Sequence, residues 1–337
     1  MRISWLFGAC LSLAVSVSAE NKNTETFLQK PEVQKFVDDL VANHGFSRDE
    51  LHKWFDQGRM QVSIIKALTR PAEKTKTYVN YKPMFVSPDT IKRGRAFEEQ
   101  HRVALERAEF VYGVPREVIL SIIAIESRFG RLKGKYRVFD ALSTIAFYYP
   151  KRARYFTKEL REFLLIAKQE GIDPLTVKGS YAGAMGYPQF MPSSFRAYAV
   201  DFDFDGKIDI WENPVDAIGS VANYFAKHGW RAGEQVTLTA KVSGDTYLDI
   251  MPKRMKLQTT YGEIKEYGWQ VTEATVNTPL TDKTKVLPFQ LETENGMEYW
   301  VGLKNFYVIT RYNHSRRYAM TVHQLSQLFA EGQSREK

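Results

Sequence analysis

The chain has 337 residues, of which 44% are hydrophobic and 13% aromatic, a composition typical of a folded globular protein and not of a disordered one. Its formal net charge of +8 favours a negatively charged neighbour, such as an anionic polymer or a membrane surface. The sequence lacks helix-turn-helix, zinc and ribonucleoprotein-type signatures, so we do not expect nucleic acid as the partner. It also lacks the P-loop, the dinucleotide fingerprint, His-Glu-x-x-His and Gly-x-Ser-x-Gly, which excludes several common enzyme classes.

The first 19 residues have the pattern of a secretory signal. One early arginine precedes an apolar run, and small residues lead to a predicted cleavage after Ala19. Removal of residues 1–19 lowers the formal charge to +7 and takes away Cys10, which is the only cysteine. We therefore predict a soluble periplasmic protein with neither thiol nor disulfide. The alternative is an outer-membrane lipoprotein acylated at Cys10, although residues 7–9 match the usual lipobox poorly.

The N-terminal third is predicted to be helical. Helical spacing of apolar residues runs from Pro31 to Tyr112, and residues 47–50 resemble a capping box at the start of one helix. A long helix is predicted to begin at Ser87-Pro88-Asp89 and to continue past Val111. We group residues 20–112 as an N-terminal helical lobe.

A helical core is predicted next, over residues 113–230. Within it, apolar periodicity predicts helices at residues 139–148, 153–170 and 215–228. A glycine-rich loop at residues 179–192 separates two of them, and such a loop lets the backbone approach a ligand closely.

After Trp230 the period of the apolar residues changes to two, which is typical of strands. The alternating segments are 235–242, parts of 286–291 and parts of 298–310. We read residues 231–308 as a small β-rich subdomain, inserted into or appended to the helical core. Residues 309–337 return to that core and contain a helix from Arg316 to about Ala330. The expected fold class is α+β, predominantly helical.

One carboxylate in the predicted core is difficult to explain by packing alone. A helix is predicted between Pro115, which suits a first turn, and Gly130, which suits the left-handed residue after a helix. Glu126 lies on the apolar stripe of that helix, which is formed by Val118, Ile119, Ile122 and Ile123. A carboxylate that loses hydration must find a partner, raise its pKa or face a cleft, and a raised pKa suits a general acid. The alternative is a buried ion pair with Arg128 or another cation.

Residues 201–212 fit the twelve-residue calcium loop of an EF-hand, with glycine at the sixth position. The predicted oxygen ligands are Asp201, Asp203, Asp205, the Lys207 carbonyl, Asp209 and Glu212. The alternative is an acidic surface loop that matches by chance. A single loop of this kind favours a structural calcium site over a calcium sensor.

An aromatic and polar run at residues 305–318 could line a polysaccharide groove together with the glycine-rich loop. Tyrosine and tryptophan faces stack on sugar rings, and amides and hydroxyls bind sugar substituents. Most of the 18 tyrosines are nevertheless expected to be core residues.

With these features the chain resembles the lytic murein transglycosylase B family, which contains lysozyme-like periplasmic enzymes that cleave peptidoglycan. The stretches that carry the resemblance are 112–115, 125–130, 140–142, 183–186, 189–194, 216–224 and 305–318. They are spread over most of residues 30–330. Two positions depart from the family pattern, since Pro188 replaces a usual glycine and Asn213 is a one-residue insertion after the calcium loop.

The resemblance implies a lysozyme-like catalytic core that holds the calcium loop, with Glu126 acting first as acid and then as base. It also implies substrate contacts from Ser180, Gln189, Tyr224, Tyr312, Asn313, Tyr318 and Arg152. Ordinary glycosidases use two carboxylates, whereas this chain offers one that is well placed. We therefore predict cleavage of the MurNAc–GlcNAc β-1,4 bond of peptidoglycan with formation of 1,6-anhydro-MurNAc ends.

Two alternatives stay open at this point. The first is a hydrolysing muramidase with a second carboxylate, and the second is a non-catalytic peptidoglycan-binding protein in which Glu126 is an ion-pair partner. We expect peptidoglycan glycan strands as the ligand and calcium as the structural cofactor, without an organic cofactor. We also expect a monomer, with proteins of wall synthesis or lysis as further partners.

Overall fold

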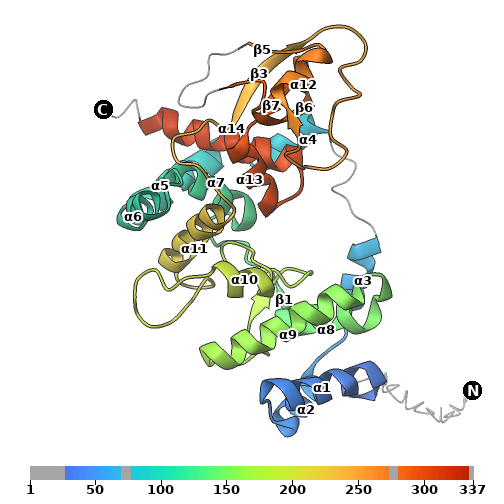
Figure 1. The fold of residues 1–337 in the computed structure, drawn as a ribbon. Helices are drawn as coiled ribbons and strands as arrows, with labels where there is room; N and C mark the ends of the chain where they lie inside the picture. Colours follow the sequence, from blue (N-terminus) through green and yellow to red (C-terminus); the bar gives the residue numbers. More distant parts are fainter. Residues whose placement is uncertain (1–26, 70–76, 273–279, 334–337) are drawn as a thin grey trace, which may run out of the picture.

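The computed structural model describes residues 27–69, 77–272 and 280–333. Helices form most of the molecule, and a small antiparallel sheet lies at one end (Figure 1). The predicted fold class, α+β and predominantly helical, is confirmed. The predicted signal at residues 1–19 lies outside the described residues. Among the described helices, none is both long and apolar enough to span a membrane.

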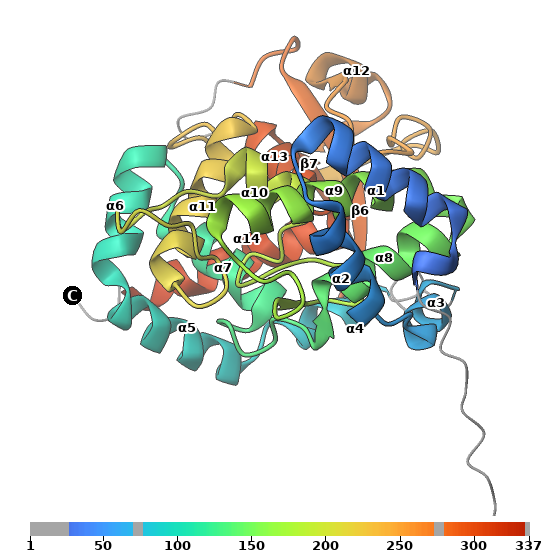
Figure 2. The same cartoon turned by 90° about the horizontal axis from the view of Figure 1, so that it is seen from below.

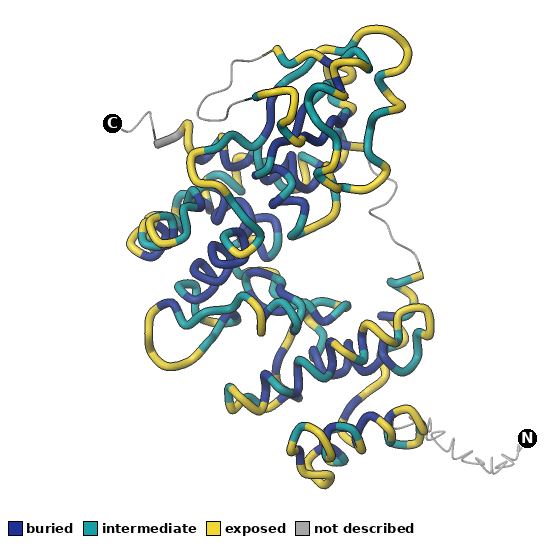
Figure 3. The backbone as a smooth tube through the Cα atoms, in the orientation of Figure 1, coloured by how far each residue is buried: buried dark blue, intermediate teal, exposed yellow. Residues whose placement is uncertain are grey.

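Helix α7 (Arg116–Ser127) lies at the centre of the helical body, with α14 (Arg316–Gln333) packed along it (Figure 1). It is also contacted by α5 (Pro88–Gln100), α6 (Arg102–Tyr112) and α11 (Pro214–Lys227). Every residue from Val118 to Ile125 is buried, and Figure 3 shows this part of the backbone in dark blue. The predicted apolar stripe therefore belongs to a helix that is buried on all sides, which keeps water away from most of the helix that carries Glu126.

Residues 87–112 do not form the single long helix that we predicted. The backbone leaves the helical conformation at His101, where φ is −118° and ψ is 25°, and α5 ends there. Helix α6 starts at the next residue, and its apolar residues do not share one buried face, because Val103 and Val111 are exposed. The change of direction lets both helices contact α7.

The helices before residue 113 pack at two places (Figures 1 and 2). Helices α1 (Pro31–His44) and α2 (Arg48–Gln57) lie near α8 (Val138–Tyr148), whereas α5 and α6 lie beside α7. Phe55 links the first group to α8, because its ring centroid lies 6.2 Å from that of Phe36 and 5.0 Å from that of Phe139. Between the two groups come α3 (Val62–Thr69) and α4 (Tyr78–Tyr81). The domain boundaries given above stay a prediction.

The predicted helices of the core are found close to their expected limits. They are α8, α9 (Ala153–Glu170) and α11, and the short α10 (Pro192–Tyr198) precedes the predicted calcium loop. A two-residue ladder pairs β1 (Tyr136–Arg137) with β2 (Lys178–Gly179), so the start of α8 is tied to the start of the glycine-rich loop. The loop therefore begins at this ladder and ends where α10 begins.

The sheet of the β-rich part has five antiparallel strands in the order β4-β6-β7-β3-β5. They are β3 (Thr237–Val242), β4 (Thr259–Thr260), β5 (Trp269–Val271), β6 (Lys285–Thr293) and β7 (Gly296–Gly302). A separate small core of Leu238, Ile264, Trp269, Val286, Val301 and Leu303 fills the space between the sheet and α12 (Tyr261–Glu266). Residues 304–310, which we predicted as part of an alternating strand, instead belong to helix α13 (Lys304–Tyr312).

Candidate active site

Glu126 is the penultimate residue of α7 and is half-buried, between Ile125 and Ser127, which are both buried. The hydroxyl of Tyr318 donates a hydrogen bond to Glu126 Oε1 at 2.6 Å. Tyr318 lies in the first turn of α14 and is only 2% exposed, so its hydroxyl is shielded from water. A short bond from a buried donor fixes the position of the carboxylate at the end of its helix.

The chain turns sharply directly after Glu126. Arg128, Phe129 and Gly130 all have positive φ values, of 50°, 57° and 82°. We predicted this conformation for Gly130 only, and the two residues before it adopt it at a cost, because they carry a Cβ atom. Gly130 has a steric reason to be glycine, since a Cβ there would overlap the ring of Tyr187. The turn leaves the end of α7 facing the glycine-rich loop.

The glycine-rich loop holds two of the predicted substrate contacts in fixed positions. Ser180 Oγ accepts hydrogen bonds from the backbone N–H groups of Ala182 at 3.3 Å and Ala184 at 3.0 Å. Gln189 has a φ of 50°, and its amide nitrogen donates to the carbonyls of Gly186 at 2.8 Å and Lys133 at 3.3 Å. The amide oxygen of Gln189 is therefore the atom that it can offer to a sugar.

Three predicted tyrosines come together beside this loop. Tyr224 and Tyr312 have ring centroids 4.7 Å apart, and the rings of Tyr312 and Tyr318 are nearly parallel at 6.5 Å. Their hydroxyls bond inside the protein, since Tyr224 donates to the carbonyl of Arg311 at 2.7 Å and Tyr312 to that of Pro188 at 2.6 Å. Each of these two hydroxyls donates its proton inside the protein, so it can offer a ligand only its oxygen as an acceptor, and Tyr224 is 7% exposed.

Burial raises the pKa of these tyrosines, whose phenols are already neutral at physiological pH without the shift. It raises the pKa of Tyr312 and of Tyr318 well above the usual value, and the nearby charge of Glu126 raises both further. Burial also raises the pKa of Tyr224, with a smaller contribution from Tyr198. Each phenol is neutral, and Tyr318 can act as a hydrogen-bond donor to Glu126 at any physiological pH.

The two remaining predicted contacts lie elsewhere. Arg152 is exposed at the start of α9, with its guanidinium carbon 5.0 Å from the ring centre of Tyr155 and 5.1 Å from that of Phe156. Asn313 is exposed after α13 and lines a separate cavity of about 960 Å³. The structure thus brings Glu126, Tyr318 and Tyr312 together, and through Pro188 it joins them to the glycine-rich loop.

His228 is a neighbour of the site that we did not predict from the sequence. Its ring stacks on Tyr224, with centroids 4.0 Å apart and an angle of 25° between the planes. Burial lowers the pKa of His228, so the ring is neutral near neutral pH, where it can pack against the tyrosine. The i, i+4 spacing on α11 is the signal that could have revealed this pair.

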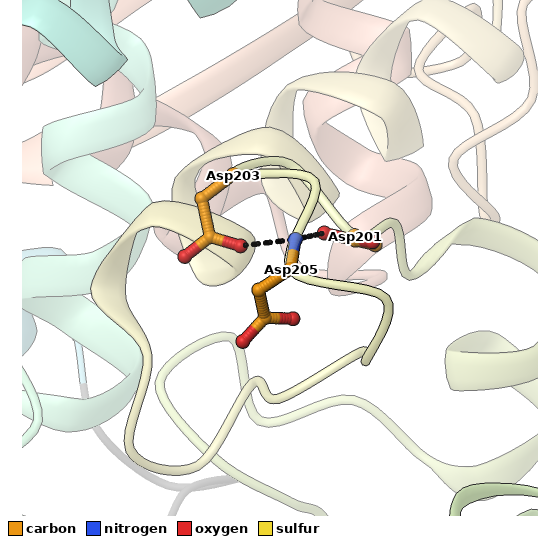
Figure 4. A group of neighbouring side chains, drawn as sticks. All are labelled: Asp201, Asp203 and Asp205. Carbon is orange, nitrogen blue, oxygen red and sulfur yellow. Dashed lines mark hydrogen bonds between the residues drawn. The ribbon is translucent and has the colours of Figure 1, made fainter.

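In the predicted calcium loop, Asp201, Asp203 and Asp205 each place a carboxylate oxygen within 4.8 Å of the others (Figure 4). Gly206, at the sixth position, has a φ of 90°, as the sharp turn of such a loop requires. Glu212, the expected last ligand, forms an ion pair with Lys133 at 2.8 Å. The three aspartates therefore fit a hard cation, whereas Glu212 would have to release Lys133 to join them.

Asp216, which we did not single out, supports this loop from beneath. It is fully buried on α11 and accepts hydrogen bonds from the backbone N–H groups of Phe202 at 2.7 Å and Asp209 at 2.8 Å. Desolvation raises the pKa of Asp216 most, and the charges of Asp203 and Asp201 add to the shift. One side chain thus connects the first and last parts of the loop to the helix that carries Tyr224.

The body is mainly helical, and a half-buried carboxylate held by a tyrosine lies beside a glycine-rich loop and aromatic rings. This arrangement is typical of a class of enzyme that cleaves glycosidic bonds. The family model described as "Transglycosylase SLT domain" matches residues 28–327. The chain belongs to this lytic transglycosylase family, as the sequence predicted.

Known relatives support this assignment. The chain is 44% identical over 313 residues to membrane-bound lytic murein transglycosylase B of Escherichia coli (strain K12), with 90% of this chain and 84% of the relative covered. It resembles the crystal structure of soluble lytic transglycosylase SltB1 from Pseudomonas aeruginosa with a TM-score of 0.85 and 48% identity, covering 90% of this chain and 100% of the other. It also resembles the Escherichia coli lytic transglycosylase Slt35 in complex with calcium, with a TM-score of 0.82 and 42% identity, covering 93% and 98%. These matches agree with the expected lysozyme-like architecture.

Proposed function

We propose that this chain is a lytic transglycosylase of peptidoglycan that uses Glu126 first as the acid and then as the base. The single observation that carries this role is the contact of the Glu126 carboxylate with the buried hydroxyl of Tyr318 at 2.6 Å. The bond holds the carboxylate at the C-terminal end of α7, from which the chain turns toward the glycine-rich loop. Family membership supplies the class of reaction, and the residues around Glu126 give it a physical basis.

In the first step, Glu126 donates its proton to the bridging oxygen of the MurNAc–GlcNAc bond, and the bond between that oxygen and C1 of MurNAc breaks. The leaving GlcNAc carries away the proton as its free 4-hydroxyl. Positive charge develops at C1, and the acetamido oxygen of the same MurNAc stabilises it. This step leaves Glu126 ionised, with the neutral Tyr318 donating to the carboxylate that has just formed.

In the second step, Glu126 takes the proton of the MurNAc C6 hydroxyl, and the C6 oxygen bonds to C1. A 1,6-anhydro ring results, Glu126 is protonated again, and no water is consumed. The ring closure is intramolecular, so it needs no second protein carboxylate and competes well with hydrolysis in a water-poor groove. The half-buried ring of Tyr312 would pack against the sugars, while Gln189 offers its amide oxygen to their hydroxyls.

Replacing Glu126 with Gln tests this assignment. The amide preserves the shape of the side chain and removes its acid–base function, so we expect loss of lytic activity together with retained binding to purified sacculi. The Gln side chain can still accept the hydrogen bond from Tyr318, which limits any structural disturbance. Unchanged lytic activity would remove Glu126 from the mechanism.

We further propose that calcium binds at Asp201, Asp203 and Asp205, completed by the Lys207 carbonyl, Asp209 and Glu212. The three carboxylates that already gather in the loop support this, as does the calcium complex of Slt35. The ion would stabilise the segment between α10 and α11, and it would take no part in the reaction. Residues 1–19 favour export to the periplasm, where peptidoglycan lies, and a lipid anchor at Cys10 is the alternative.

A further inference from the structure

Lys133 lies in the turn between α7 and β1 and contacts both the calcium loop and the glycine-rich loop. Its ammonium donates a hydrogen bond to the carbonyl of Trp211 and forms an ion pair with Glu212 at 2.8 Å. The same ammonium lies 5.2 Å from the centre of the Tyr187 ring. The side chain of Lys133 is only 23% exposed, so these partners replace much of its hydration. A partly buried cation therefore connects the end of the calcium loop to the loop that carries Gln189.

The backbone of the same region joins these two loops as well. The carbonyl of Lys133 accepts a hydrogen bond from the side-chain amide of Gln189 at 3.3 Å. The backbone N–H of Tyr187 donates to the carbonyl of Ile210 at 2.9 Å. A Cβ at Gly186 would overlap that carbonyl, so the two loops are in direct contact there. A displacement of Ile210 or of Lys133 would therefore also displace the residues beside Gln189.

Glu212 is a partner that Lys133 and a bound cation would have to share. It occupies the twelfth position of the calcium loop, where a glutamate usually binds calcium through both carboxylate oxygens. One of those oxygens, Oε2, lies against the Lys133 ammonium. The side chain of Glu212 is 77% exposed, so it has room to turn from one partner to the other. Lys133 therefore opposes calcium binding, both by holding Glu212 and by repelling the ion.

We propose that Lys133 is a positioning residue that competes with calcium for Glu212 and so couples the calcium loop to the glycine-rich loop. The inference rests on the calcium site proposed above, and it gives Lys133 a role beyond the set of calcium ligands. The ammonium keeps its bond to the Trp211 carbonyl whichever partner Glu212 takes, because that bond does not involve the carboxylate. By linkage, the ion pair that weakens calcium binding is weakened by calcium to the same extent.

Calcium affinity tests the competition. Lys133→Met removes the ammonium and keeps an unbranched side chain of similar length. Lys135→Met is the matched control, because Lys135 lies in the same turn, is exposed and forms no ion pair with the parts of the chain that the structure describes. Calcium is titrated into each protein by calorimetry at low salt. We expect Lys133→Met to bind calcium about tenfold more tightly than the unmodified protein, and Lys135→Met to stay within about twofold of it.

A second background separates competition from simple charge repulsion. The Glu212→Gln variant cannot form the ion pair, so adding Lys133→Met to it should raise the calcium affinity by no more than about twofold, the part due to repulsion. An equal gain with and without Glu212→Gln would mean that Lys133 acts through its charge alone, and it would overturn the proposal. An unchanged or weaker calcium affinity of the single variant Lys133→Met would overturn it too.

Hydrogen exchange, measured in the presence of a chelator, tests the coupling to the glycine-rich loop. The Tyr187 amide bonds to Ile210, one residue before the Trp211 carbonyl that Lys133 holds. We expect this amide to exchange about tenfold faster in Lys133→Met than in the unmodified protein or Lys135→Met, whereas Lys133→Arg, which keeps the charge, should exchange at the unmodified rate. Equal exchange in all four proteins would overturn the coupling. A lack of calcium binding by the unmodified protein is a different failure, because it would refute the calcium site and the inference with it.

Discussion

Replacing Tyr318 with Phe removes one hydroxyl and keeps the ring, so it isolates the contact on which Glu126 depends. The hydroxyl lies 2.6 Å from Glu126 Oε1, and the tyrosine is 2% exposed, so water cannot easily replace it. The ring should stay in place, because it is buried in α14 and lies parallel to that of Tyr312.

The expected size of the effect follows from the type of bond. A hydrogen bond to a charged group contributes about 1.5 to 3 kcal/mol, and that amount of lost transition-state stabilisation lowers kcat by roughly tenfold to hundredfold. The carboxylate is ionised between the two steps, so the bond matters most during the reaction and little for the binding of substrate. We therefore expect kcat to fall while KM changes little.

The assay is release of soluble muropeptides from purified sacculi over a range of substrate concentrations. Tyr299→Phe is the matched control, because its hydroxyl bonds to Tyr247 in the β-rich part, and this variant should keep the kcat of the unmodified protein. A normal kcat for Tyr318→Phe, or a loss explained wholly by a lower melting temperature, would refute the positioning role of Tyr318.

Three other outcomes can be measured on the folded protein. Calcium at about a hundredfold excess over its Kd should stabilise the protein by about 2.7 kcal/mol, so a chelator should lower the melting temperature. A melting temperature that the chelator leaves unchanged would exclude the site. Burial lowers the pKa of His101 and His228 below the ordinary 6.5, so the unfolded chain binds more protons in acid. The melting temperature should thus fall between about pH 7 and about pH 5, and His228→Gln should flatten the slope; an unchanged slope would contradict this. At Gly134 a Cβ would overlap the Gly179 carbonyl, so Gly134→Ala should lower the free energy of unfolding in urea by more than about 3 kcal/mol. Gly171 lies in open space, so Gly171→Ala should lower it by about 1 kcal/mol. Equal losses for the two variants would refute the steric reason.

Helices with strong amphipathic patterns could be predicted from the sequence. Helices α8, α9 and α11 lie within a residue or so of their predicted limits. Helix α9 has one regular apolar face, whereas α8 and α11 are buried over nine and ten consecutive residues. The break at His101 could not be predicted, since neither glycine nor proline marks it. The glycine of that segment, Gly94, lies inside α5, where a Cβ would overlap the ring of Phe329. Packing against distant parts of the chain decides both features.

Helix α13 shows how tertiary contacts override local preference. Its β-branched and aromatic residues favour a strand, and from the sequence we predicted parts of this segment as one. In the structure, the side chain of Asn305 is fully buried and bonds to the N–H and carbonyl groups of Arg231 and to the carbonyl of Glu234. Those three bonds fix the start of the helix from a segment more than seventy residues earlier, and no local pattern reveals them.

The candidate site could be predicted only in part, because tertiary contacts also bring its residues together. Glu126 stood out in the sequence because a carboxylate on an apolar helix face has few stable explanations. Its partner Tyr318 is 192 residues away, and its role could be stated only as an implication of the family resemblance. The family pattern also cannot tell that Tyr224 and Tyr312 direct their hydroxyls to backbone carbonyls.

The mass of the sugar end released from purified sacculi tests the central claim most directly. If Glu126 serves both steps, the MurNAc ends formed by the unmodified protein will be 1,6-anhydro ends, one water lighter than the products of hydrolysis. The Glu126→Gln variant, assayed on the same sacculi, will release none. Reducing MurNAc ends as the main product would contradict the account, because water, and not the C6 hydroxyl, would then have attacked C1.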